Sequence, residues 1–274
     1  MKKAFPTIAA VFGLAISGPL TDSAKGAALA LDGDGDWVSF AGAGIPTGNA
    51  PFTLGAWINP TSPTGGGAGG QITFWGEQAG NQSNGFRMRG PAGVRHYFWG
   101  NDHDEDFSGG SILPDDSGPN GDGWHHLALT FDGSETRWYH NGAILGAPRA
   151  VSDVTVADSN YRIGARLAAE FFDGFIDEVS VWGAALGADD IAGGYNQPIN
   201  PATPGLIAYW NFEDGLTDLA GGDNNGTFMG DASIDTTRDA LTVIPEPSSF
   251  GLSLTGITAL ALVLRRRKRE PLLG

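Results

Sequence analysis

The feature that most constrains the fold is the length and spacing of the apolar segments between residues 28 and 196. These segments are short, and clusters of Gly, Asn, Asp and Pro separate them. FTLGAWINP places Phe52, Leu54, Ala56 and Ile58 on one face of a strand, because side chains alternate with a period of two. HHLALTF shows the same alternation with Leu127, Leu129 and Phe131. Short alternating strands separated by frequent turns predict an all-β sandwich or barrel.

Two local signals refine this prediction. The dipeptide Asn141-Gly142 follows the strand-like RWYH, and it favours a type I′ hairpin because both central residues of that turn need a positive φ. The stretch GADDIAGGYN at residues 187–196 predicts the single short helix. The 43 glycines of the 274-residue chain fit a protein with many turns.

Charge and cysteine content exclude several classes of protein. The net charge is −15, and residues 27–244 hold 8 Arg and no Lys against 28 Asp and Glu, which gives −20. Such a surface repels nucleic acid and anionic membranes, because binding either of them needs cationic contacts. It suits a soluble exported protein, in which most of the Asp residues form a solvated surface and clustered carboxylates would suit Ca²⁺. The absence of Cys excludes a disulfide scaffold and a thiolate metal site.

The N-terminal segment has the composition of a secretory signal peptide. Lys2 and Lys3 precede an apolar stretch from Ala4 to Leu20, and small residues follow it. We expect residues 1–26 to form the signal peptide, with cleavage after Gly26 or nearby. An uncleaved N-terminal anchor is the alternative.

The C-terminal segment has a second apolar run, which covers residues 248–264 and carries no charge. A helix of this length reaches ~26 Å, slightly less than the ~30 Å hydrocarbon core of a bilayer. The basic cluster that follows would stay in the cytoplasm and leave the acidic domain outside. It consists of Arg265, Arg266, Arg267, Lys268 and Arg269.

This tail resembles the PEP-CTERM sorting signal. Pro245, Glu246 and Pro247 precede the marginal helix and the basic cluster, in the order found in that signal. The resemblance implies that an exosortase in the inner membrane of a Gram-negative bacterium removes residues 241–274. The protein would then pass from an inner membrane-anchored precursor to the cell surface or the extracellular polysaccharide matrix. A retained single-pass transmembrane anchor is the alternative.

The central segment resembles a laminin-G-like domain. The blocks that carry the resemblance occur in the expected order: LDGDGDWVSF, PFTLGAWINP, GWHHLALTFDGS, WYHNGAILG, RIGA and FFDGFIDEVSVWGAALGADDI. The resemblance implies a concanavalin-type jelly roll of two antiparallel sheets, with six or seven strands each. We expect the domain to cover residues 27–240, with a core at 28–196 and closing strands at 204–234.

Carboxylates are the candidate metal ligands. Asp32, Asp34 and Asp36 stand at alternate positions in LDGDGDWV, a spacing that can wrap a hard cation. The laminin-G-like resemblance implies a structural Ca²⁺ bound by Asp177 of the IDEV strand together with this N-terminal turn. An acidic turn without metal is the alternative. The segment NDHDEDF at residues 101–107 is a second cluster of carboxylates that could bind a metal, and we expect it to be a solvated loop instead.

Catalytic signatures are absent from the sequence. The Glu-x-Asp-x-Glu strand motif of jelly-roll glycan hydrolases does not occur, and neither does a Gly-x-Ser-x-Gly nucleophile elbow. His125 and His126 are adjacent on a strand and point to opposite faces, which argues against a shared zinc ion. The sequence therefore predicts a protein that is not an enzyme.

Aromatic residues are the candidate ligand contacts. Trp75, Tyr97 and Trp99 lie on predicted strands, where their rings can stack on sugars or pack in the core. We expect an exported, non-catalytic binding or adhesion module of the cell envelope or polysaccharide matrix that recognises carbohydrate or a surface protein. The alternatives are a glycan hydrolase or lyase on the same jelly roll and a purely structural matrix protein.

Overall fold

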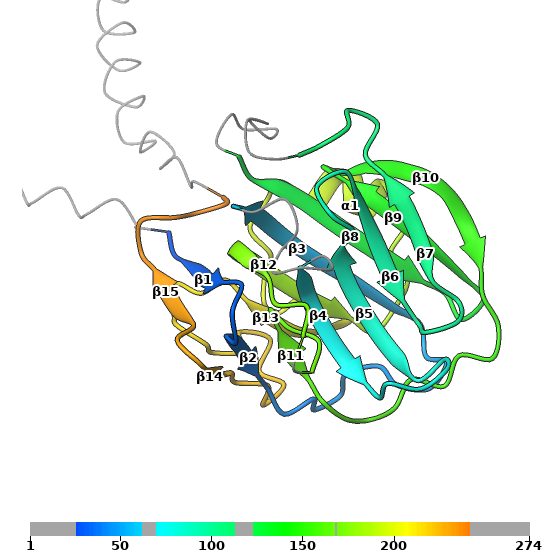
Figure 1. Ribbon diagram of the computed structural model, residues 1–274, viewed down its shortest axis with the longest axis horizontal. Coiled ribbons are helices and arrows are strands. Elements are labelled where there is room, and N and C mark those ends of the chain that lie inside the picture. The colour runs from blue at the N-terminus through cyan, green and yellow to red at the C-terminus, as the bar shows by residue number, and fades with distance from the viewer. Residues whose placement is uncertain (1–25, 62–69, 113–122, 168, 242–274) are drawn as a thin grey trace, which may run out of the picture. The chain divides into compact units, whose positions relative to one another are not determined.

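The computed structural model describes residues 26–61, 70–112, 123–167 and 169–241, which lie in the unit at 25–243. Two antiparallel sheets stack face to face in this unit (Figure 1). The prediction of an all-β, two-sheet antiparallel sandwich is therefore confirmed. The sheets have eight and seven strands instead of six or seven each, because the closing segment adds strands to both.

The eight-stranded sheet contains the longest strands and has β3 and β12 at its centre. β13 pairs with the second half of β12, beside the path of the other seven strands. In spatial order, the seven are β10 (Ala143–Ala150), β9 (Glu135–His140), β8 (His125–Phe131), β3 (Phe52–Pro60), β12 (Asp173–Trp182), β1 (Ala28–Asp32) and β15 (Ser233–Asp235), and β13 is Leu206–Trp210.

The seven-stranded sheet packs against the first and ends in an acidic strand. In spatial order it contains β14 (Thr227–Met229), β2 (Trp37–Ser39), β11 (Arg162–Ile163), β4 (Gln71–Gly76), β5 (Ser83–Met88), β6 (Gly93–Tyr97) and β7 (His103–Asp106). The prediction that residues 101–107 form a solvated loop is wrong, since His103–Asp106 pair with β6 as the edge strand. Successive side chains of a strand point to opposite faces, so His103 and Glu105 lie on one face of this strand and Asp104 and Asp106 on the other. This separation allows an acidic segment to pair as a strand.

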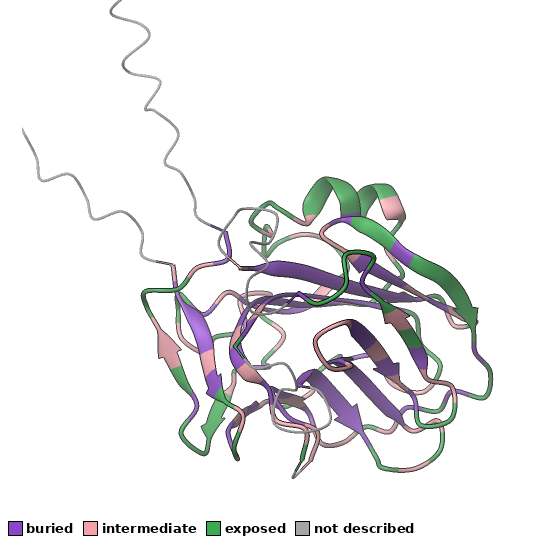
Figure 2. Ribbon diagram, turned by 45° about the horizontal axis from the view of Figure 1, so that its top comes forward, coloured by how far each residue is buried: buried purple, intermediate pink, exposed green. Residues whose placement is uncertain are grey.

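The core fills the space between the sheets. Leu54, Leu129 and Ile176 of one sheet and Ile72 and Phe86 of the other are at most 1% exposed. Figure 2 shows this burial as purple along the facing strands. Removing a side chain of this size from water contributes about 1.5–3 kcal/mol, so the alternating apolar positions provide most of the stability.

Two local predictions are confirmed. Asn141 and Gly142 connect β9 to β10 with φ values of 49° and 77°, as a type I′ hairpin requires. Helix α1 (Ala188–Gly194) lies within the predicted segment, and Ile191 is its buried residue. It packs against the outer face of the eight-stranded sheet, with Ala128 and Tyr139.

A β-bulge interrupts β12. The register with β3 shifts between Asp177 and Ser180, and Glu178 has a φ of 52°. Asp177 pairs with Trp57, and Tyr209 of β13 donates a hydrogen bond from its hydroxyl group to Glu178. The extra residue therefore places two consecutive carboxylates on the outer face of the sheet, where strict alternation allows one.

The two sorting segments lie almost wholly outside the described residues. Three features therefore remain predictions: the signal peptide at 1–26, the sorting motif at Pro245–Pro247 and the helix at 248–264. Within residues 26–61, 70–112, 123–167 and 169–241, no helix has the length and apolar character needed to cross a membrane.

Candidate functional site

Two of the predicted ligand-contacting aromatics lie together on the outer face of the seven-stranded sheet. Tyr97 ends β6 and stands opposite Gly85 of β5. A Cβ at Gly85 would lie 3.0 Å from the Cβ of Tyr97, so the glycine leaves the space that the phenol ring uses. His96 and Phe98 are fully buried toward the core, and Tyr97 and Trp99 alternate with them and face outward.

Arginines stack on both rings. The Cζ atom of Arg87 lies 5.6 Å from the ring centroid of Tyr97, and that of Arg166 lies 5.1 Å from Tyr97 and 5.7 Å from Trp99. The two aromatic rings are 5.4 Å apart. Guanidinium groups at this range are attracted by the ring faces, so they favour the ring orientations that the structure shows.

One carboxylate holds both arginines. Glu170 Oε2 lies 2.5 Å from Arg87 Nη1 and accepts a hydrogen bond of 2.7 Å from Arg166 Nε, and Glu170 Oε1 accepts one of 2.8 Å from Arg166 Nη2. The side chains of Arg87 and Glu170 are only 6% and 10% exposed. We call the group Arg87, Tyr97, Trp99, Arg166 and Glu170 the aromatic–arginine patch. Sequence reasoning missed its three charged members, because no local sequence pattern links Arg87 to Arg166 and Glu170.

Trp99 is the exposed member of this patch. The residue is 37% exposed, and its backbone has a φ of 59°. The backbone N–H of Trp99 donates to Asp102 Oδ1 at 3.1 Å, which fixes the turn that presents the indole ring. Burial raises the pKa of Tyr97, which therefore stays a neutral phenol at physiological pH.

Trp75 does not join the patch. It is fully buried, its ring stands edge-on to Phe52 at 6.1 Å, and its Nε1–H donates to the carbonyl oxygen of Pro46 at 2.9 Å. The prediction that Trp75 contacts a ligand is wrong, because the ring has no exposed surface and its only donor is used.

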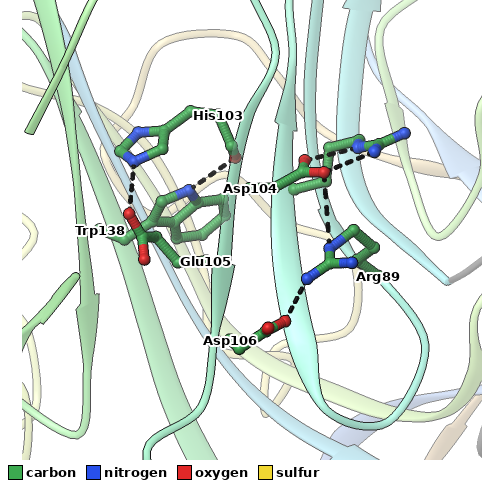
Figure 3. A network of polar contacts seen from close by, with 7 residues as sticks. Arg89, His103, Asp104, Glu105, Asp106 and Trp138 are labelled. Atoms are coloured by element: carbon green, nitrogen blue, oxygen red, sulfur yellow. Dashed lines mark hydrogen bonds and ion pairs between the residues drawn. The ribbon is translucent and has the colours of Figure 1, made fainter. Parts of the chain in front are cut away.

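The carboxylates of β7 are tied to arginines of the same face. Asp104 accepts hydrogen bonds of 2.6 and 2.5 Å from Arg95, and Arg89 bridges Asp104 and Asp106 (Figure 3). The hydrogen bonds from Arg95 lower the pKa of Asp104. An acid that is held ionised cannot protonate a glycosidic oxygen, so Asp104 does not have the raised pKa of the general acid in a glycan hydrolase.

Inward-facing residues of β7 join the two sheets. His103 Nδ1 lies 2.8 Å from Thr136 Oγ1. Trp138 Nε1 donates to the carbonyl oxygen of His103 at 3.1 Å (Figure 3). Burial lowers the pKa of His103. These contacts give the histidine a structural role in the sandwich.

Asp177 belongs to an acidic group on the outer face of the eight-stranded sheet, which we call the Asp177 centre. Carboxylate oxygens of Asp177, Glu213 and Asp239 lie within 4.8 Å of one another. Asp177 is fully buried and accepts backbone N–H bonds from Glu178 at 2.7 Å and Ala240 at 3.0 Å. Burial raises the pKa of Asp177 and raises that of Glu213 to about 7. A hard cation would relieve the repulsion among these oxygens, so the donor set fits Ca²⁺.

The predicted metal ligands do not form one site. Asp32 joins Asp36 and Asp231 in a different acidic group, while Asp177 has Glu213 and Asp239 beside it. Asp34 belongs to neither group, and its backbone N–H donates to Asp32 Oδ1 at 2.9 Å. The prediction of a shared site for Asp32, Asp34 and Asp177 is therefore wrong in its membership.

The adjacent histidines point to opposite faces, as predicted. His125 faces inward, where its Nδ1 lies 3.1 Å from His140 Nε2, and His126 packs on Trp57 on the outer face. His126 also borders a cavity of about 410 Å³ between the outer face and the α1 region, with Gly55, Ser180 and Tyr195 in its wall. The sequence carries no sign of this cavity, because its wall comes from distant segments.

Comparisons with known proteins agree with this architecture. Residues 32–192 match the Laminin_G_3 family model of the concanavalin A-like lectin/glucanases superfamily. A candidate carbohydrate-binding protein from Bacteroides ovatus is similar in structure, with a TM-score of 0.58 and 21% identity over 77% of this chain. This chain spans 59% of the length of that protein.

Two further structures show weaker similarity. A heptameric pentraxin from Limulus polyphemus is 14% identical, with a TM-score of 0.44 over 63% of this chain and 82% of its own. The sialyllactose-bound CBM40 of a Ruminococcus gnavus IT-sialidase is 13% identical, with a TM-score of 0.41 over 59% of this chain and 96% of its own. No curated protein matches the chain. The family match covers more than half of the sequence, and the chain belongs to the Laminin_G_3 family of concanavalin A-like lectins and glucanases.

Proposed function

We propose that this protein is a non-catalytic carbohydrate-binding module that recognises glycans through the aromatic–arginine patch. The observation that carries the proposal is the partly exposed indole of Trp99 beside Tyr97, held by Arg166 on the outer face of a sheet. An aromatic ring in a fixed orientation can cover the apolar face of a sugar at a small entropic cost. The polar groups around the rings can hydrogen-bond to sugar hydroxyls.

Two observations support a binding role without turnover. The Bacteroides protein of the same fold is described as carbohydrate-binding, which makes glycans the first class of ligand to test. The carboxylates of β7 on this face are paired with arginines, and the pKa of Asp104 is lowered. A hydrolase would need one carboxyl group with a raised pKa beside the bound sugar.

A glycan array with purified protein tests the proposal. Trp99→Ala is expected to weaken glycan binding about tenfold or more, the effect of truncating a central aromatic contact. Phe228→Ala is the matched control, because Phe228 is 42% exposed on β14, at the opposite edge of the same sheet. Equal binding by Trp99→Ala and wild type would refute the assigned surface.

A reducing-end assay on the bound glycans separates the alternatives. Binding without release of reducing ends is the expected result. Release of reducing ends would support a hydrolase or lyase, and no binding to any glycan would support a purely structural matrix protein.

Export and sorting complete the proposal. The signal peptide would carry the acidic domain across the inner membrane, and an exosortase would recognise Pro245–Pro247 and release the protein to the cell surface or extracellular matrix. Mass spectrometry of the mature protein from its host is expected to show a C-terminus near Pro245. A mature chain that retains residues 248–269 would establish a permanent anchor instead.

Calcium at the Asp177 centre is a further part of the proposal. Asp177, Glu213 and Asp239 would hold the ion, and the ion would neutralise the buried carboxylate of Asp177. An ion that binds only the folded state raises stability by mass action. We expect Ca²⁺ to raise the thermal midpoint relative to EGTA, and Asp177→Asn to reduce that difference; an unchanged midpoint in wild type would refute the site.

A further inference from the structure

The turn between β1 and β2 packs directly on the turn between β14 and β15. β1 pairs with β15 in the eight-stranded sheet, and β2 pairs with β14 in the seven-stranded sheet. Both connections therefore pass from one sheet to the other at the same corner, where Figure 1 shows the blue and orange strands side by side. Gly230 makes the approach possible, since a Cβ there would lie 2.5 Å from the carbonyl oxygen of Gly35.

This corner brings three carboxylates together. Oxygens of Asp32, Asp36 and Asp231 lie within 4.8 Å of one another. Asp32 ends β1, Asp36 precedes β2, and Asp231 comes from the far end of the domain. Like charges at this range repel, so a fold that collects them needs a compensating positive charge.

The state of Asp36 points independently to a missing partner. Asp36 is only 1% exposed, and its Oδ2 accepts the backbone N–H of Asp32 at 2.9 Å. Its Oδ1 is buried and has no hydrogen-bond partner. A buried carboxylate oxygen without a partner is costly, and a cation bound at the group would satisfy it.

The surrounding cavity has room for a hydrated ion and is acidic. Its volume is about 310 Å³, and its wall includes all three carboxylates together with Asp173 and Thr61. Asp173 is the register partner of Asp32 across β1 and β12. None of the described residues that line this cavity is Lys, Arg or His.

We propose that Asp32, Asp36 and Asp231 form a Ca²⁺ site, separate from the Asp177 centre, that ties the two sheets together at this corner. The donors are all oxygens, which hard cations prefer. Three protein carboxylates favour Ca²⁺ over Mg²⁺, which keeps most of its waters and is usually bound by one or two carboxylates. Oxygens up to 4.8 Å apart can contact one Ca²⁺, whose ligands lie at about 2.3–2.6 Å.

Calcium titration of the full-length chain tests the site. In an Asp177→Asn background, which removes the central ligand of the Asp177 centre, one Ca²⁺ is expected to bind. Adding Asp231→Asn should weaken that binding at least tenfold. Adding Asp34→Asn instead is the matched control and should leave it unchanged, because Asp34 lies in the same turn but outside the acidic group.

Terbium luminescence provides a second readout in the same Asp177→Asn background, which is needed because Trp57 stands opposite Asp177 and could sensitise an ion bound there. Trp37 follows Asp36 directly and can sensitise Tb³⁺ bound at the corner. We expect Tb³⁺ emission that Ca²⁺ displaces and that Asp231→Asn reduces at least tenfold. Emission that is unaffected by Asp231→Asn, or a site that binds Mg²⁺ as tightly as Ca²⁺, would overturn the proposal; glycan binding has no part in either result.

Discussion

Replacing Glu170 by Gln should strongly lower the free energy of unfolding, because Glu170 belongs to a largely buried ion pair. The change removes one negative charge and keeps the size of the side chain. Glu170 is bound by two arginines, Arg87 at 2.5 Å and Arg166 at 2.7 and 2.8 Å. Arg87 would keep its positive charge in a position where its side chain is only 6% exposed.

The expected magnitude follows from this burial. Breaking a buried ion pair by removing one partner costs about 3–5 kcal/mol, because the other charge stays desolvated. An exposed pair contributes about 0–1 kcal/mol. Glu135→Gln is the matched control, since Glu135 and Arg137 form a pair at 2.9 Å whose side chains are 40% and 32% exposed.

Urea unfolding of both variants measures the difference. Glu170→Gln should lower the free energy of unfolding by about 3–5 kcal/mol, and Glu135→Gln by less than about 1 kcal/mol. Glycan binding should also weaken in Glu170→Gln, since Arg166 would no longer be held against Tyr97 and Trp99. Arg87→Met combined with Glu170→Gln should recover part of the stability, because it removes the charge left unpaired. Equal costs for the two single variants would refute the reasoning.

Three further predictions concern single residues. Trp75→Phe should lower the free energy of unfolding by about 1–3 kcal/mol through lost packing and a lost hydrogen bond, and should leave glycan binding unchanged on the array; a selective loss of binding would contradict its core position. Burial lowers the pKa of His126 from 6.5 to about 3, so the stability it contributes is present above pH 6.5 and is lost as pH falls toward 3. Between pH 7 and 5 this loss is about 2 kcal/mol at ~1.36 kcal/mol per pKa unit, and urea unfolding of His126→Gln should show a weaker pH dependence over that interval. Gly142→Ala should lower the thermal midpoint, because the φ of Gly142 is +77° and a Cβ there would lie 2.4 Å from a ring carbon of Tyr195. Gly109→Ala is the control and should leave the midpoint unchanged, because a Cβ at Gly109 would have no atom within 4 Å.

The fold class follows from patterns that are local in the sequence. Alternation at Leu127, Leu129 and Phe131 identifies a strand with one buried face, and Asn141-Gly142 identifies the turn of a hairpin. Each signal depends on a few neighbouring residues and on backbone geometry, so it can be recognised without the partner strand. The opposite orientations of His125 and His126 were predictable for the same reason.

The metal prediction failed at the step that needs tertiary contacts. The alternate positions of Asp32, Asp34 and Asp36 suggested that neighbours in the turn would share an ion. The structure instead places Asp231 beside Asp32 and Asp36, while the side chain of Asp34 stays outside the group. Asp231 reaches this group because β1 pairs with β15 and β2 pairs with β14, which brings the turns between these strands together. These pairings join the two ends of the domain, so the sequence of the first turn does not reveal them.

The sequence by itself determined that this protein is an acidic, cysteine-free chain of short strands that is rich in aromatic residues. It also placed Trp99 on a strand, whereas the structure places it in the turn that follows β6. Only the tertiary structure decided that Trp75 is core and that Trp99 is surface. Both tryptophans belong to β-rich segments. Period-two alternation shows which residues of a segment share a face, but it does not show which face points into the core. Which face meets the other sheet depends on pairing register and on bulges, such as the shift between Gln71 and Thr73 in β4, and these arise from contacts between strands.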